Sequence, residues 1–193
     1  MDPLALDTRT DAGTGLPEAL RVLLAAYPRA GWAADPQFHG LVSFWLERHQ
    51  MFRKLLGILR EDTALLLDRQ SDPQTFAARL GRFGGMFVNE LHGHHQIEDQ
   101  HYFPLLAQKD ARIIRGFDIL DSDHHALDGL LDGFVKGANA LLQRVGEREA
   151  LQTATGRFAA DLDRLERLID RHLTDEEDLI VPVILHHGTA GLG

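Results

Sequence analysis

Apolar residues recur at helical spacing through four long stretches of this chain, and nowhere do apolar and polar residues alternate as they would in strands. Short polar links such as QSDP and QKD separate the stretches. Helices joined by short links tend to pack as antiparallel neighbours. The sequence therefore predicts an all-α fold, an up-down-up-down four-helix bundle.

Two turns that contain proline predict where the first two helices begin. Asp35 with Pro36, and Ser71 or Asp72 with Pro73, each place an N-cap residue before a proline at the first helical position.

The residues before the first of these turns differ from the rest in composition. They are rich in Asp, Gly and Thr, apart from an apolar patch at residues 17–27, and we expect a flexible arm with a possible short extra helix. The predicted organisation is an N-terminal arm (1–34), the bundle (35–187) and a C-terminal tail (188–193).

Composition limits what such a bundle can do. With 193 residues, 44% of them hydrophobic, the chain can bury the core of one domain. A formal net charge of −9 would repel phosphate backbones, so we expect no nucleic-acid partner. The sequence has neither a membrane-spanning apolar run nor a signal-peptide pattern at its start, so we expect a cytoplasmic protein with no membrane partner. Because the chain has no cysteine, metal ligands must be nitrogen and oxygen atoms.

Each apolar stripe carries a histidine where leucine or phenylalanine would be expected. In the second and fourth stripes a glutamate follows that histidine four residues later, on the same face of the helix. The two halves of the chain also align with each other on these histidines and glutamates, as a helix pair used twice would. The pattern brings together, near the middle of the bundle, His49, His94, Glu98, His124, His172 and Glu176.

Two glutamates inside a bundle need a cation, because burying an unpaired carboxylate costs several kcal/mol. Imidazole and carboxylate without thiolate favour non-haem iron, with manganese or zinc as alternatives. We expect two metal ions bridged by the glutamates, with open positions for a small ligand. Further acids near these residues in sequence could orient the histidines, namely Asp99, Asp123, Asp128 and Glu177.

The motifs resemble those of the hemerythrin-like, or HHE cation-binding, proteins. The resemblance covers roughly residues 36–187 and rests on ERHQMFRKLL, HHQIEDQHYFP, DHHALDGLL and HLTDEEDLIVP. It implies a four-helix bundle around a non-haem di-iron centre, with the six residues named above as ligands. Oxygen-carrying invertebrate hemerythrins have a second histidine four residues on in the third helix and an aspartate five after the last histidine. Here Asp128 and Glu177 stand at those positions, which argues against reversible oxygen carriage alone.

Three neighbouring histidines leave alternatives open. His95 could replace His94, which we favour because it lies on the apolar stripe and pairs with Glu98. His125 is the corresponding alternative to His124. His101 lies on the stripe and could be a further ligand, a proton donor or a hydrogen-bonded core residue, and the last is the interpretation we favour.

The leading interpretation is a non-haem di-iron protein that binds oxygen or a related small ligand, or that senses or holds iron. One alternative is an enzyme with peroxidase, catalase-like or nitric-oxide-reducing activity. The other is a bundle in which the metal is purely structural. The expected partner is a small diatomic ligand or peroxide; the sequence does not decide whether the chain is an enzyme and identifies no protein partner.

Overall fold

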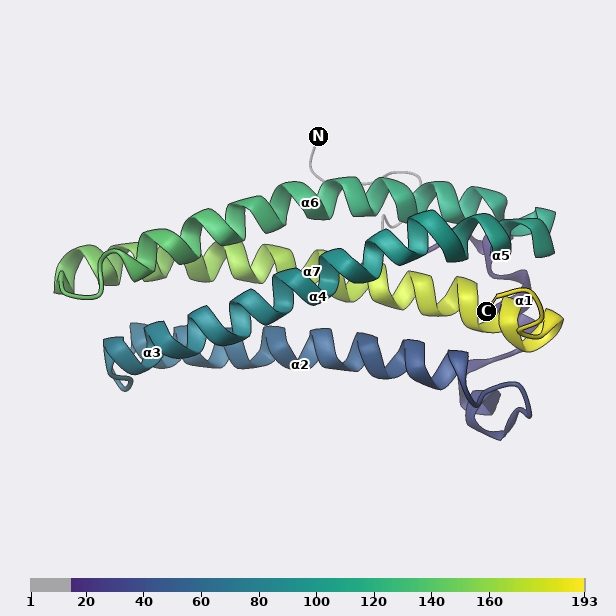
Figure 1. Cartoon of the computed structure of the whole chain (residues 1–193), viewed down its shortest axis with the longest axis horizontal. Coiled ribbons are helices and arrows are strands. Elements are labelled where there is room, and N and C mark those ends of the chain that lie inside the picture. The colour runs from purple at the N-terminus through teal and green to yellow at the C-terminus, as the bar shows by residue number, and fades with distance from the viewer. Residues whose placement is uncertain (1–14, 193) are drawn as a thin grey trace.

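The computed structural model describes residues 15–192, and over this range every regular element is helical. Four long helical segments lie side by side, and successive segments run in opposite directions (Figure 1). The first, third and fourth are α2 (Leu41–Leu67), α6 (Ile114–Leu142) and α7 (Arg148–His187). The predicted all-α bundle is confirmed.

The second long segment is a run of helix built from five consecutive pieces. They are α3 (Pro73–Arg79), η3 (Leu80–Gly84), α4 (Gly85–Ile97), η4 (Glu98–Tyr102) and α5 (Phe103–Lys109). The pieces η3 and η4 are π-helical, so each hydrogen-bonded turn there holds one residue more than an α-helical turn. Residues that follow a π turn are therefore rotated relative to the apolar stripe that precedes it.

One of the two predicted helix starts is confirmed and the other is wrong. Asp72 caps α3, because its side chain accepts a hydrogen bond of 2.8 Å from the backbone N–H of Thr75. Asp35 caps a turn instead, accepting from the N–H of Gln37 at 2.8 Å, and α2 begins only at Leu41. The intervening Gly40 has φ of 81°, a left-handed conformation that glycine adopts without strain.

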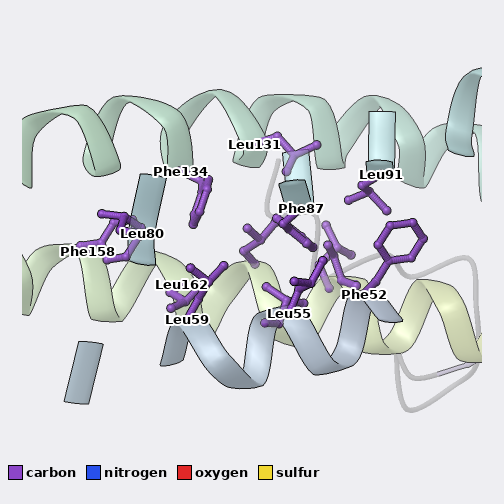
Figure 2. Close-up of a cluster of buried hydrophobic side chains, with 14 of the residues drawn as sticks. Phe52, Leu55, Leu59, Leu80, Phe87, Leu91, Leu131, Phe134, Phe158 and Leu162 are labelled. Carbon is purple, nitrogen blue, oxygen red and sulfur yellow. The ribbon is translucent and has the colours of Figure 1, made fainter. Parts of the chain in front are cut away.

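Two apolar clusters form the core. The first fills the half of the bundle that contains the α6–α7 turn, with Phe52, Phe87 and Phe158 among its fully buried members (Figure 2). The second fills the opposite half, around Trp45 and Leu179. Between the two clusters each long segment buries polar residues, and this polar layer holds the predicted histidines and glutamates.

The described part of the predicted N-terminal arm packs against the bundle instead of standing apart from it. It forms η1 (Glu18–Leu20), α1 (Val22–Ala26) and η2 (Arg29–Ala34). Its apolar side chains are buried in the second core cluster, namely Leu16, Leu20, Leu23 and Trp32. Leu20 and Leu23 of the apolar patch noted in the sequence are therefore core residues, whereas Val22 is exposed; the rest of the arm, residues 1–14, lies outside the described range.

The chain turns back over the bundle after α7. Gly188 ends the helix with φ of 73°. Leu192 is 2% exposed and belongs to the second core cluster, while Lys109 donates a 2.8 Å hydrogen bond to the carbonyl of Ala190. Within residues 15–192, no helix is long and apolar enough to cross a membrane.

Candidate metal centre

The polar layer gathers seven potential metal ligands into two groups. Each of the four long segments contributes at least one of them, because each places its histidine between the two apolar clusters. The first group consists of His49, His94, Glu98 and Glu176, and the second of His95, His124 and His172. Within each group, the potential ligand atoms all lie within 4.8 Å of one another. The structure thus brings all six predicted residues together and adds a seventh, His95.

Glu98 extends between the two groups. Its Oε1 lies 2.9 Å from Nε2 of His94 in the first group, and its Oε2 lies 3.6 Å from Nε2 of His124 in the second. The side chain is 1% exposed. One carboxylate oxygen therefore faces each group.

Glu176 repeats this arrangement from α7. Its Oε1 lies 3.5 Å from Nε2 of His49, and its Oε2 lies 3.6 Å from Nε2 of His172. The indole N–H of Trp45 donates a short hydrogen bond to Oε1 of Glu176. Two carboxylates that each face both groups have the arrangement of ligands that bridge a pair of metal ions.

His95 was the less favoured alternative to His94, and the structure shows that the two do not exclude each other. Consecutive helical residues point about 100° apart. The ring of His94 faces His49 on α2, with centroids 5.1 Å apart, whereas the ring of His95 stacks on His124 of α6 at 4.0 Å. Both faces are interior because the segment carrying them lies between α2 and α6. The adjacent pair in HGHHQIED was the sequence signal for this. Because only one of two adjacent histidines can lie on a single apolar stripe, the stripe alone makes them appear to be alternatives.

In three of the histidines, an acidic side chain lies beside Nδ1, the ring nitrogen on the side away from the centre. Nδ1 of His49 lies 3.0 Å from Oε1 of Glu177, and Nδ1 of His124 lies 2.7 Å from Oδ1 of Asp99. An ionised carboxylate only accepts hydrogen bonds, so each Nδ1 carries the proton. The lone pair on Nε2 is then free to face the centre.

Of the other two acids predicted to orient histidines, one lies beside a histidine of the centre and the other does not. Asp123 is fully buried, and its Oδ2 lies 3.5 Å from Nδ1 of His172. Asp128 is exposed and forms no such contact with the described residues. Three of the four acids noted in the sequence therefore lie beside Nδ1 of a histidine of the centre.

Burial and the neighbouring charges shift the pKa values of the residues in the centre in different directions. Burial, and then the charge of Glu176, raises the pKa of Glu98 well above its usual value. Burial also raises the pKa of Glu176, but the nearby His49 and His94 outweigh this and hold it well below the usual value. Burial lowers the pKa of His94 to about 3 and takes that of His95 well below its usual value.

Several donor atoms have no hydrogen-bond partner among residues 15–192. They include both ring nitrogens of His95 and Nε2 of His124, which are buried. Over the same range, no lysine or arginine forms an ion pair with Glu98 or Glu176, and the charged or titratable side chains nearest to their carboxylates include histidines. Orphaned buried donors cost free energy unless a ligand engages them. The donor set therefore fits a pair of metal cations.

The remaining histidines near this layer lie outside both groups. His125 is exposed, and its Nδ1 lies 2.8 Å from the carbonyl oxygen of Asp121. His101, which we expected in the core, is also exposed, with Nε2 3.3 Å from the carbonyl oxygen of Leu192. The π turn η4 explains the difference, because its extra residue rotates His101 away from the stripe on which an α-helix would have placed it.

The hemerythrin HHE cation-binding domain matches residues 40–184, a span that includes all seven donors. The chain belongs to the hemerythrin HHE cation-binding family. No curated protein and no solved structure matches it. The donors of this hemerythrin domain can hold a metal, which agrees with cation binding by the family.

This hemerythrin domain departs from the oxygen carriers in ways the structure now explains. Glu177, at the position of their aspartate, contacts Nδ1 of His49, whereas Glu176 faces both groups of histidines. Asp128, at the position of their second histidine on the third helix, is exposed. His95, from the second segment, instead brings the histidines of the centre to five.

Proposed function

We propose that the chain is a non-haem di-iron protein that binds oxygen or a related small ligand, or that senses or holds iron. One observation carries the proposal: Glu98 and Glu176 each direct one oxygen to either group of histidines. Nitrogen and oxygen donors without thiolate suit iron, although manganese and zinc remain competitors. A bound di-iron pair would supply reversible redox change and coordination positions for a small ligand.

The chain's own residues would prepare the centre for that ligand. Glu177 and Asp99 hold His49 and His124 with the proton on Nδ1, so that Nε2 faces inward. Trp45 donates to Glu176 and fixes the carboxylate oxygen that faces His49. Each of these contacts limits the rotation of a donor and preorganises the centre.

The two groups are unequal, which supports ligand binding over a purely structural metal. The second group has three histidines, whereas the first has only His49 and His94. With both glutamates shared, a metal in the first group would have fewer protein ligands. That metal is the one with room for an exogenous ligand.

Metal analysis of the purified protein tests the proposal. We expect two irons per chain after anaerobic ferrous loading, and new visible absorption on exposure to oxygen or addition of azide. A single tightly bound zinc with no response to either reagent would contradict it. If the iron-loaded protein accelerates loss of peroxide or nitric oxide beyond free iron, the enzymatic alternative would replace the binding function.

A further inference from the structure

A cavity of about 380 Å³ lies between α2 and α4. Its wall on α2 includes Phe44, Trp45 and, one helical turn later, Arg48, and its wall on α4 includes Gly93 and Ile97. Phe44 is 59% exposed and Ile97 is 56% exposed, so these two apolar side chains also face solvent. The cavity thus combines apolar surface with one arginine and the carboxyl groups of Glu90 and Glu98.

The cavity reaches the first group of metal donors. His94 and Glu98 form part of its lining, and both belong to the group that has two histidines instead of three. None of the three histidines of the second group lines it. A molecule in the cavity would therefore lie beside the metal that has fewer protein ligands.

The size of the cavity exceeds what a diatomic ligand needs. A water molecule, comparable in size with a diatomic, takes up about 30 Å³ in the liquid. Pockets for organic ligands run from about 300 to 1,000 Å³, a range that includes this cavity. Gly93 lines this space, and a Cβ built there would meet nothing within 4 Å, so a side chain can be introduced at this position without a clash at Cβ. A large side chain at this position would extend between α2 and α4.

Arg48 gives the cavity a charge preference. Its Nη2 donates to Oε2 of Glu90 at 2.7 Å, and its guanidinium carbon lies 5.5 Å from the ring centroid of Phe52. Within residues 15–192, the other guanidinium nitrogens of Arg48 have no hydrogen-bond acceptor. Two divalent ions would exceed the charge of the two bridging glutamates, which adds positive potential at the inner end. The remaining N–H groups of Arg48 can bind a ligand carboxylate in addition to that of Glu90, and the apolar walls favour a hydrophobic body.

We propose that this cavity binds a small organic carboxylate with an apolar body, such as an aromatic acid, beside the metal centre. The proposal rests on the di-iron function proposed above and names a class of ligand for it. The cavity is thus a binding site in its own right, in addition to a route by which small ligands reach the metals.

Benzoate and azide separate the cavity from the metals. Calorimetric titration of the iron-loaded protein should show saturable benzoate binding, with the neutral isostere benzamide about tenfold weaker because it lacks the charge-assisted bond to Arg48. Azide, which needs only an open metal position, is titrated by its visible absorption in the same samples.

Two variants and one control locate the binding. Gly93→Leu should abolish benzoate binding yet leave azide affinity within about twofold, because azide occupies far less of the cavity. Arg48→Gln should weaken benzoate about tenfold and remove the preference over benzamide. Gly57→Leu is the matched control: Gly57 lies within α2, outside the cavity, and its Cβ would also meet nothing within 4 Å.

Different outcomes refute the two proposals. A chain with two irons that binds azide but not benzoate would overturn the cavity proposal alone. Equal losses of azide and benzoate in Gly93→Leu would also overturn it, because the cavity would then be only a passage to the metals. A chain that takes up no metal would overturn the di-iron proposal, and the cavity proposal with it.

Discussion

Replacing His95 with leucine should have opposite effects on the metal-free and the metal-loaded protein. In the described structure the His95 ring is 4% exposed, and neither ring nitrogen has a hydrogen-bond partner. Burial, followed by the positive charge of nearby histidines, keeps its pKa well below the usual value, so the ring is neutral. Without metal, the ring is a buried polar group that nothing satisfies.

The size of the effect follows from that missing partner. An unsatisfied buried polar group costs about 1–3 kcal/mol, and leucine is close to histidine in volume. His95→Leu should therefore stabilise the metal-free protein by about 2 kcal/mol. For a chain of this size, that corresponds to a rise in Tm of roughly 4–8 °C. With metal the sign reverses, because the second group of donors loses one of its three imidazoles.

Urea denaturation of the metal-free protein and metal analysis of the loaded protein measure the two effects. The control is His125→Leu, which replaces a histidine outside both donor groups whose side chain is 77% exposed. It should change neither metal content nor, by more than about 0.5 kcal/mol, stability. If His95→Leu destabilised the metal-free protein and still held two metals, the interpretation of His95 as a ligand would be wrong.

Three further predictions follow from single contacts. Gly116→Ala should destabilise the protein by about 1–3 kcal/mol in urea denaturation, because its Cβ would lie 2.7 Å from both methyl carbons of the buried Leu179. Unchanged stability would mean that Leu179 can move aside. Trp45→Phe keeps an aromatic ring but removes the hydrogen bond to Glu176, so it should weaken metal binding about tenfold in a chelator competition. An unchanged affinity would show that this hydrogen bond does not position the carboxylate. Burial raises the pKa of Glu177, but its bonds to one histidine and two arginines outweigh this and lower it from 4.5 to about 2. The stabilisation it gives the metal-free protein is therefore full above pH 4.5 and lost as the pH falls through about 2, and Glu177→Gln should reduce the slope of stability against pH in that window.

The bundle could be predicted from the sequence because its cause is local and repeated. Helical spacing of apolar residues, a capped start at Asp72 and short links act over a few residues each. The six predicted donors come together for the same reason, since each occupies an apolar stripe and every stripe faces the interior. The start of α2 at Leu41 could not be obtained this way, because Asp35 can cap either a turn or a helix.

The sequence by itself determined the helical class, the chemical type of the centre and six of the donors that meet in it. Only the tertiary structure decided that His94 and His95 both point inward, because a helix packed between two others has two interior faces. It also decided that His101 points outward, since the π turn that contains it changes the register of the helix. These outcomes depend on how segments distant in sequence pack together, and that packing is not encoded in the periodicity of any one segment.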